Sequence, residues 1–401
     1  MINLGEIKDA AKVIRGTVLK TPLLHSEILS RMFECEVYLK LENQQETGSF
    51  KIRGAAYKIM KRVEAIGPLG VVTASAGNHA QGVARAAAQA SIPATVIMPA
   101  WASITKQEST RSYGGEVIIF GDSLEDSLNK ARDLAEEGRT FIHPFDDEDI
   151  IRGQGTIALE ILEDLPDPDT VLVPVGGGGL ISGVSTVCKA VRPETRIVGI
   201  QSENCPSAYQ ALHDGRITSV AALRSLADGI NVKRVGGLNF EVIKKYVDEI
   251  VLVDEEHIAE AVLLLLESKK ILVEGAGAVP LAAMLSGVVS VAKGSRVVLI
   301  ISGGNLDSPL LGRIIDRGLV KKGRIVRLWI YLDDTPGSLA SLLASVARLE
   351  ANVLHIRHDR HILDAPLTVT RVELELETRG PDHVDEIERI LKEAGYRLEK
   401  R

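Results

Sequence analysis

The chain has 401 residues, of which 45% are hydrophobic and 25% are charged, and 54 acidic side chains against 47 Lys and Arg give a net charge of −7. This length predicts two or three domains, and the composition is that of a globular protein rather than of a disordered, collagen-like or coiled-coil chain. The acidic balance provides no basic field for binding nucleic acid.

Strand-like apolar runs alternate with helical patterns along the first three-quarters of the chain. This alternation indicates an α/β fold with a mostly parallel sheet covered on both faces. We expect one set of repeats in a small domain at 44–143 and a second set in a large domain made of 1–43 and 144–320. The expected strands cover residues 37–41, 70–73, 94–98, 116–120, 171–175, 196–201 and 296–301, and the expected helices cover residues 49–63, 78–90, 106–113, 123–137, 180–191 and 306–317.

The pattern changes after a basic, glycine-containing joint at 320–324. Beyond the joint, period-two alternation marks strands and a 3.6-residue period marks helices in the order βαββαβ. We therefore expect a small α+β domain with an antiparallel sheet at 324–401. Its expected strands cover 325–332, 352–362 and 367–377 with a last short strand, and its expected helices cover 338–349 and 382–394.

The first motif places a lysine where a helix is expected to start, in the segment Ser49-Phe50-Lys51-Ile52-Arg53-Gly54. A helix N-terminus disfavours an ammonium group, so this place favours a neutral amine or a Schiff base at Lys51. On this segment alone, a solvated lysine stays an open alternative.

The second motif follows a strand and opens a helix, and its sequence is Ser75-Ala76-Gly77-Asn78-His79. Small residues let backbone amides approach an anion at a helix start. The alternative is a plain turn in which Ser75 caps the helix. We expect His79 to be a packed, hydrogen-bonded histidine rather than a base.

The third motif is four glycines after an apolar strand, Gly176-Gly177-Gly178-Gly179, followed by Leu180. Consecutive free N–H groups at a helix start form a cradle for phosphate. The run lacks the Lys of a P-loop and the spacing of a dinucleotide fingerprint. It favours a phosphate-bearing cofactor that is not a dinucleotide.

Two further motifs have a polar residue beside glycines. Ser302-Gly303-Gly304-Asn305 offers a neutral hydroxyl at a strand end, although on this segment alone helix capping is the better explanation of Ser302. Glu274, before Gly275-Ala276-Gly277, is either a cleft carboxylate or a first-turn helix residue. Ligands of open α/β sheets lie beyond the carboxyl ends of strands, which is where these motifs are expected.

In chain order, the four motifs with Lys51, Asn78, the glycine run and Ser302 resemble those of the fold type II pyridoxal-phosphate enzymes, with a tryptophan-synthase-β-like fold, and most of all those of the threonine dehydratases (threonine ammonia-lyases). The resemblance covers roughly residues 5–320. It implies pyridoxal 5'-phosphate as cofactor, with Lys51 joined to it and acting as the catalytic base, and Phe50 packed on its ring. Its other implied contacts are Asn78 with the phenolic oxygen, Ser302 with the ring nitrogen, and the amides of Gly176, Gly177, Gly178, Gly179 and Leu180 with the phosphate.

The same resemblance implies that Ser75, Ala76, Gly77, Asn78 and His79 bind the substrate carboxylate. L-threonine would lose its α-proton and β-hydroxyl to give 2-oxobutanoate and ammonia, and L-serine would give pyruvate. Racemases that resemble this family carry a second Ser where this chain has Ala76, and a methyl group cannot donate a proton. The alternatives are an L-serine dehydratase, a serine racemase or a β-replacement synthase, and a non-catalytic amino-acid sensor.

The C-terminal segment resembles an ACT domain, an amino-acid-sensing module, around Asp334-Thr335-Pro336-Gly337-Ser338-Leu339 and Ala351-Asn352-Val353. We expect Thr335 to cap a helix that begins at Pro336. A branched end product such as isoleucine would bind here and reduce activity; the alternative is a module that only dimerises. The candidate effector residues are Asp334, Gly337, Ser338, Leu339 and Asn352.

The remaining expectations concern location and assembly. Three separated cysteines, Cys35, Cys188 and Cys205, predict reduced, buried thiols in a cytoplasmic protein. The N-terminus has no signal-peptide pattern, and the uncharged stretch 275–292 predicts a buried helix rather than a membrane span. We expect a homodimer or homotetramer. Whether a cation binds is left open, with Asp228 as its candidate ligand and a solvated loop residue as the alternative.

Overall fold

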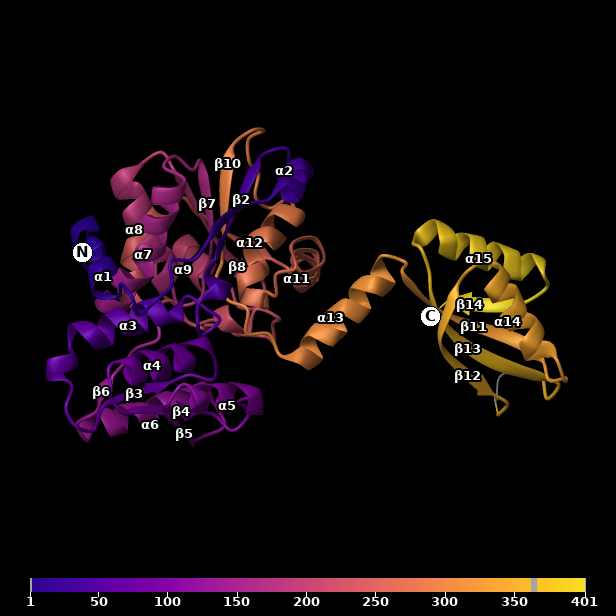
Figure 1. Cartoon of the computed structure of the whole chain (residues 1–401), viewed down its shortest axis with the longest axis horizontal. Helices are drawn as coiled ribbons and strands as arrows, with labels where there is room; N and C mark the ends of the chain where they lie inside the picture. Colours follow the sequence, from indigo (N-terminus) through magenta and orange to yellow (C-terminus); the bar gives the residue numbers. More distant parts are fainter. Residues whose placement is uncertain (1, 362–365, 401) are drawn as a thin grey trace. The chain divides into compact units, whose positions relative to one another are not determined.

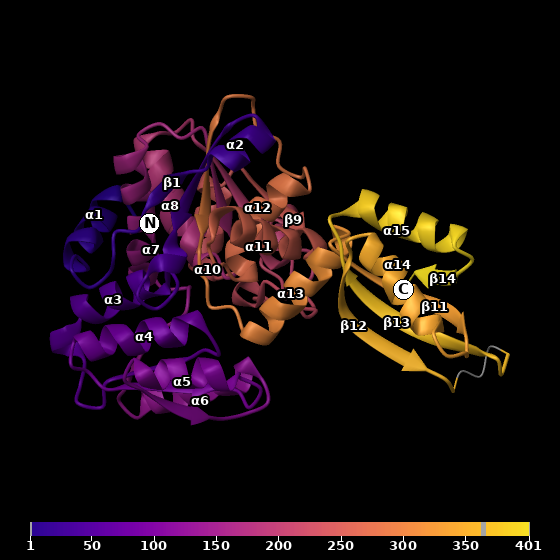
Figure 2. The ribbon, with the colours of Figure 1, turned by 45° about the vertical axis from the view of Figure 1, so that its right-hand side comes forward.

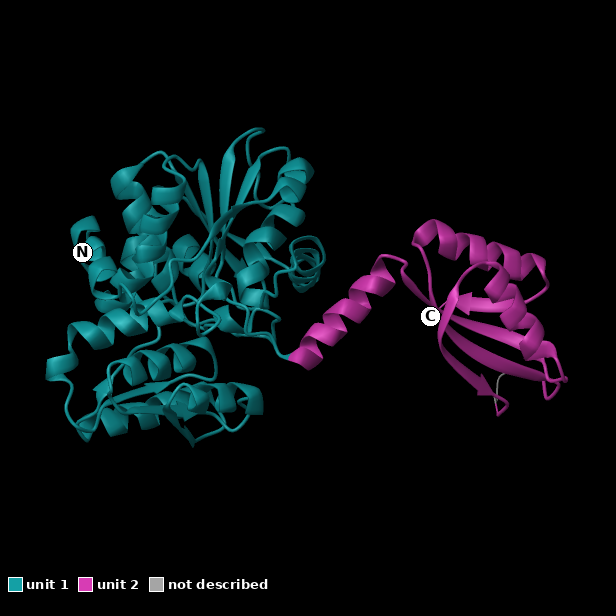
Figure 3. Ribbon diagram, viewed as in Figure 1, with its two compact units in different colours: residues 1–307 teal, residues 308–401 magenta. Residues whose placement is uncertain are grey.

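The chain forms two compact units, residues 1–307 and residues 308–401 (Figure 3). The structure, a computed structural model, describes residues 2–361 and 366–400. Each unit has its own sheets and core, and the candidate catalytic motifs all lie in the first.

A six-stranded sheet forms the centre of the first unit (Figure 1). All neighbouring strands are parallel except the first pair, which is antiparallel. This confirms the predicted mostly parallel α/β sheet. In spatial order the strands are β1 (Leu23–His25), β2 (Glu36–Leu41), β10 (Arg296–Ile301), β7 (Thr170–Pro174), β8 (Arg196–Ser202) and β9 (Glu249–Val253).

Helices cover both faces of this sheet (Figures 1 and 2). The apolar α12 (Gly275–Leu285) packs on one face, and α7 (Glu148–Asp164) and α8 (Gly179–Val191) pack on the other. The predicted burial of the uncharged stretch is confirmed for α12, in which all residues from Gly275 to Met284 are buried. The other elements around the sheet are α1 (Leu4–Val13), α2 (Glu27–Phe33), η1 (Glu42–Gln44), α9 (Ser207–Asp214), η3 (Asp228–Ile230), α10 (Gly237–Tyr246) and α11 (Glu255–Lys269).

A second, four-stranded parallel sheet lies within residues 71–141 of the same unit. Helices α3 (Lys51–Lys61) and α4 (Asn78–Gln89) pack together beside it. In spatial order its strands are β5 (Gly115–Ile119), β4 (Ala94–Met98), β3 (Val71–Ala74) and β6 (Thr140–Phe141), and the remaining elements are η2 (Val63–Ala65), α5 (Ile104–Ser112) and α6 (Leu124–Glu136).

The second unit has the predicted βαββαβ order after a leading helix, α13 (Ser308–Lys321). Alternate residues of its two central strands, 325–333 and 369–377, are buried, as expected for an antiparallel sheet with helices on one face. The sheet order is β12-β13-β11-β14. The elements are β11 (Ile325–Asp333), α14 (Ser338–Arg348), β12 (Asn352–Asp359), β13 (Val369–Glu377), α15 (Pro381–Glu393) and β14 (Arg397–Lys400).

Several boundaries differ from the predicted ones. The unit boundary precedes α13, whereas we expected this helix to end the large domain. Helix α3 begins at Lys51, two residues later than expected, because Ser49 forms a β-bridge with Gly303. The expected strand over 352–362 ends at Asp359, and position 362 lies outside the described residues.

Cys35, Cys188 and Cys205 are free and buried, as predicted. Within the described ranges, we find no helix whose length and apolar character would let it cross a membrane.

Candidate active site

The predicted motifs lie where parallel strands end, as the sequence predicted. The segment 75–79 follows β3, the glycine run follows β7, and Ser302 follows β10. The antiparallel Ser49–Gly303 bridge joins the loop before Lys51 to the β10 motif. The Phe50 amide donates to the Ser302 carbonyl at 3.1 Å, and the Gly304 amide donates to the Gly48 carbonyl at 2.9 Å. Segments far apart in the sequence therefore share one site.

Lys51 is the first residue of α3, as the motif predicted. Its Nζ donates to the Pro144 carbonyl at 3.0 Å and lies 5.2 Å from the centre of the Phe50 ring. Burial lowers the pKa of this amine to about 8, although the Glu274 carboxylate acts in the opposite direction. The amine thus has a larger neutral fraction at physiological pH than an ordinary lysine, and the neutral form is the one that acts as nucleophile or base.

The glycine run is buried against residues that follow Pro144. A Cβ at Gly177 would meet the Phe145 ring at 2.3 Å, and one at Gly179 would meet the Phe145 carbonyl oxygen at 3.0 Å. Gly178 has a φ of 98°, a left-handed conformation that favours glycine. In the described part of the chain, no hydrogen bond uses the amides of residues 176–180 as donors. The run therefore presents free N–H groups at the start of α8, which suits an anion.

Asn78 and Glu274 form the polar centre of the site. The Asn78 amide Nδ2 donates to Glu274 Oε1 at 2.7 Å, and the Asn78 Oδ1 accepts from Asn305 Nδ2 at 2.8 Å. Burial first, and then the Asp228 carboxylate, raise the pKa of Glu274 to about 7, although Lys106 and Asn78 act in the opposite direction. Glu274 precedes α12 but makes no capping hydrogen bond through its side chain, and its carboxylate binds Asn78 instead, which favours the interpretation as a site carboxylate.

Asn305 is a site residue to which sequence reasoning gave no role. Besides Asn78, its Nδ2 donates to the Thr47 carbonyl at 2.9 Å, and its Oδ1 occupies the space where a Cβ on Gly48 would lie, 2.4 Å away. Its presence in the quoted motif with Ser302 was the available signal. Asn305 ties the loop before Lys51 to α4.

The loop of residues 75–79 differs from a capped turn. The Ser75 hydroxyl accepts from the Gly77 amide at 3.2 Å, and Gly77 is the N-cap of α4, so the alternative with Ser75 as cap is wrong. Within the described residues, no hydrogen bond uses the amides of Ala76, Asn78 or His79 as donors. These N–H groups form a second place that suits an anion.

His79 is a packed residue, as predicted. Its Nε2 is 3.2 Å from the Ile142 carbonyl and donates to it as the neutral tautomer. Burial, together with the Lys51 charge, lowers the pKa of His79 to about 3. The imidazole ring is therefore neutral throughout the physiological pH range.

Ser302 is buried, and the helix that follows it begins only at Ser308, so Ser302 does not cap that helix. Among the described residues, its hydroxyl has no hydrogen-bond partner, while its carbonyl receives the Phe50 amide. The free hydroxyl is available to a ligand.

A charged pair that the sequence did not reveal connects the two sheets of the first unit. Lys106 on α5 donates to Asp228 on η3 at 2.6 Å. Although burial acts in the opposite direction, Asp228 raises the pKa of Lys106. Asp228, left open as a cation ligand, therefore has a protein partner, and in the described ranges no group of three or more His, Cys, Asp or Glu residues is arranged to hold a metal ion.

The candidate effector residues lie in the second unit, four of them around the start of α14 and Asn352 at the start of β12. The expectation that Pro336 begins this helix is wrong, because the helix begins at Ser338 after Gly337, whose φ is 94°. Thr335 also does not cap it through a backbone amide, since its hydroxyl pairs with the Ser338 hydroxyl at 2.8 Å.

Two other candidate effector residues already have partners. Asp334 lies 3.2 Å from Arg360 in an ion pair, and Asn352 donates to Glu377 at 3.4 Å. Leu339 packs against the core of the unit.

Comparisons with known proteins agree with this geometry. Residues 14–303 match the family described as pyridoxal-phosphate dependent enzyme. The chain is 50% identical over 399 residues to the L-threonine ammonia-lyase of Thermotoga maritima, covering 99% of both chains.

Among solved structures, a threonine deaminase from T.th. matches with a TM-score of 0.72 and 39% identity, over 76% of this chain and 99% of that one. Maize serine racemase matches with a TM-score of 0.74 and 35% identity, over 80% of this chain and 98% of that one.

Proposed function

The chain belongs to the family of pyridoxal-phosphate-dependent enzymes, and on that premise we propose that it is a threonine ammonia-lyase that converts L-threonine to 2-oxobutanoate and ammonia. The observation that carries this proposal is the link between the Lys51 amine and the glycine run. Pro144 accepts the hydrogen bond from Lys51, and the next residue, Phe145, packs on Gly177 and Gly179. Two consecutive residues thus hold an amine of lowered pKa beside a set of free amides.

The residues of the site fit pyridoxal phosphate. The free amides of residues 176–180 suit its phosphate, and glycine is needed at position 177 because a Cβ there would overlap the Phe145 ring. The Lys51 amine suits its aldehyde, and the free Ser302 hydroxyl suits its ring nitrogen. Asn78 keeps one N–H of its amide beyond the bond to Glu274, and this N–H suits the phenolic oxygen.

When bound, pyridoxal phosphate supplies the electron sink that stabilises negative charge at the substrate α-carbon. Lys51 takes the α-proton, since its amine is the group in the site with a pKa of about 8. The free amides of Ala76, Asn78 and His79 hold the substrate carboxylate. Neutral Ser302, unlike a carboxylate, does not stabilise a charged ring nitrogen, which favours prompt loss of the β-hydroxyl.

The competing activities fit less well. Ala76 offers no proton for the second face of the α-carbon, which disfavours racemisation. A non-catalytic sensor would have no need of the buried Lys51 amine beside free amides.

The test is the formation of 2-oxobutanoate from L-threonine, with pyruvate formation from L-serine measured in parallel. We expect activity on both, a higher kcat/KM on L-threonine, and no activity for Lys51→Ala. D-serine formation at a rate that rivals elimination would instead identify a racemase, and an inactive wild type that binds amino acids would identify a sensor.

We also propose that the second unit is an ACT module that senses isoleucine, and that the protein is a cytoplasmic homodimer or homotetramer. The βαββαβ order and the left-handed Gly337 before α14 support the module, and the three buried thiols support the location. Isoleucine should reduce activity in the wild type, and Asn352→Ala should weaken that response. An unchanged response in that variant would place the effector elsewhere. The molar mass in solution tests the assembly.

A further inference from the structure

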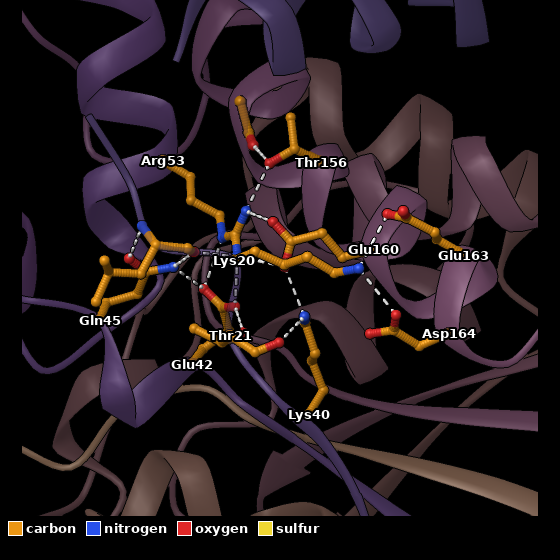
Figure 4. Close-up of polar contacts among 12 residues, drawn as sticks. Lys20, Thr21, Lys40, Glu42, Gln45, Arg53, Thr156, Glu160, Glu163 and Asp164 are labelled. Carbon is orange, nitrogen blue, oxygen red and sulfur yellow. Dashed lines mark hydrogen bonds and ion pairs between the residues drawn. The ribbon is translucent and has the colours of Figure 1, made fainter. Parts of the chain in front are cut away.

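A buried ionic cluster lies behind the helix that carries Lys51 (Figure 4). Its centre is Arg53, whose Nε and Nη2 donate to both oxygens of Glu42 at 2.7 and 2.8 Å. The Arg53 Nη1 and Nη2 donate to both oxygens of Glu160 at 2.6 and 2.9 Å. One guanidinium group thus holds two carboxylates, each through two hydrogen bonds.

The cluster is largely buried and balanced in charge, with two cations and two carboxylates, of which Glu160 is partly exposed. Arg53, Glu42 and Lys40 are fully buried, and the Lys40 ammonium donates to Glu160 at 2.6 Å. Although burial acts in the opposite direction, Arg53 lowers the pKa of Glu42, so this carboxylate stays charged. A buried ionic cluster contributes little net stability compared with an apolar one, so its presence calls for another explanation.

Arg53 is placed to fix the start of α3. It lies two residues after Lys51, and residues two apart on an α-helix point about 200° away from each other. The Lys51 amine accordingly contacts Pro144, while Arg53 points to Glu42 after β2 and to Glu160 on α7 (Figure 4). The first turn of α3 is held from behind by two separate elements.

Close backbone contacts complete the connection to the glycine run. A Cβ at Gly153 on α7 would meet the Arg53 carbonyl oxygen at 2.6 Å, and a Cβ at Gly155 would meet the Gly183 carbonyl oxygen on α8 at 3.0 Å. Helix α7 therefore touches both α3, which begins with Lys51, and α8, which follows the free amides. A shift of α3 on α7 would change the distance between the amine and those amides.

We propose that Arg53, through Glu42 and Glu160, is a positioning residue that sets the Lys51 amine at its working distance from the phosphate-binding amides. This inference rests on the proposed function. Arg53 touches neither substrate nor cofactor and acts only through the backbone of α3.

The test compares Arg53→Lys with a matched control, Arg152→Lys. A lysine keeps the charge but loses the planar fork that holds two carboxylates. Arg152 lies on α7, is 8% exposed, and pairs with Glu6, Glu148 and Asp149. Asp149 also pairs with Lys58 and Lys61 near the end of α3, so replacing Arg152 disturbs a charged cluster that contacts the end of α3 and not its start. Thermal unfolding of each variant measures the shared structural cost.

Three further measurements are specific to positioning. They are the dissociation constant of added pyridoxal phosphate by absorbance, the fraction of Lys51 peptide labelled after borohydride reduction, and kcat and KM for L-threonine. Since a displacement of about 1 Å costs roughly a hundredfold in rate, R53K should lower kcat about tenfold to a hundredfold and weaken cofactor binding about tenfold. KM should change little, and R152K should match the wild type.

Glu160→Gln keeps the proposal testable should R53K fail to fold, because it removes one carboxylate charge at constant size and should give a smaller loss in the same direction. Loss of thermal stability without change in cofactor binding, Lys51 labelling or kcat would overturn the positioning role. Absence of label on Lys51 in the wild type would instead defeat the proposed function itself, and the positioning role with it.

Discussion

The carboxylate of Glu274 accepts a hydrogen bond from the side-chain amide of Asn78 across 2.7 Å, and the two residues are 196 positions apart in the chain. Asn78 begins α4 beside the smaller sheet, and Glu274 precedes α12, which covers the larger sheet. A Cβ on Gly303 would meet Glu274 Oε1 at 2.3 Å, so the carboxylate is also enclosed by the β10 motif. One contact therefore joins both sheets at the point where the substrate is expected to react.

The raised pKa of Glu274 predicts a pH dependence of stability. The folded chain keeps this proton up to about pH 7, whereas an ordinary glutamate releases it near 4.5, so the folded state binds more protons between these values. The free energy of unfolding of the wild type should fall as the pH rises from about 4.5 to about 7, relative to that of Glu274→Gln. Urea unfolding of both proteins at several pH values measures this, and parallel curves would contradict it.

The lowered pKa of Lys51 predicts a reactive amine in the protein freed of cofactor. An amine with a pKa of about 8 is half neutral at that pH, whereas an ordinary lysine is almost fully charged. Acetylation followed residue by residue with mass spectrometry should show the reactivity of Lys51 rising through about pH 8. Lys61 on the same helix is the control, because its hydrogen bond to Asp149 raises its pKa. Equal pH profiles for the two lysines would count against the assignment.

The site segments that follow a local sequence pattern could be predicted. A strand followed by small residues and a helix places ligand-binding amides at a strand end, and this rule located the glycine run, the loop at 75–79 and Ser302. The antiparallel C-terminal sheet was equally accessible, because alternate residues of β11 and β13 are buried. Local sequence patterns were therefore sufficient to predict both the fold class and the segments that form the site.

Contacts between distant elements were not predictable in this way. Helix α7 was not predicted, although Asp147 caps it, because its packing depends on Gly153 and Gly155 meeting other helices. The Lys106–Asp228 pair was not predicted either, since nothing in the sequence near one residue indicates the other. The expectation that Pro336 begins α14 was wrong, because the left-handed Gly337 lies between this proline and the first residue of the helix, Ser338.

The Lys106–Asp228 ion pair predicts that the KM for L-threonine depends on these two charges. The pair links the two sheets, and Asp228 precedes Gly229, beside which Glu274 lies. Since Asp228 is largely exposed, solvent screening limits the effect, and we expect Asp228→Asn and Lys106→Met each to raise KM about two- to fivefold with little change in kcat. Steady-state kinetics with L-threonine at low and high salt measure this.

The exchanged pair Lys106→Asp with Asp228→Lys provides the control for that prediction. If the link between the sheets is what matters, the double variant should recover part of the lost affinity, and high salt should reduce the difference between wild type and single variants. A double variant no better than the sum of its component single variants, Lys106→Asp and Asp228→Lys, would show that each charge acts separately.

Replacement of Gly177 by alanine tests the glycine run itself. The added Cβ would lie 2.3 Å from the Phe145 ring, so either Phe145 or the run must move, at a cost of about 1–3 kcal/mol. Because Phe145 follows the residue that holds Lys51, both cofactor affinity and attachment at Lys51 should fall. Gly312→Ala on α13 is the matched control: nothing lies within 4 Å of its added Cβ, and alanine there should stabilise the helix by about 0.5–1 kcal/mol. Cofactor titration and thermal unfolding of both variants separate the effect on cofactor affinity from the effect on stability. If G177A binds pyridoxal phosphate as tightly as the wild type does, the amides of this run do not hold the phosphate.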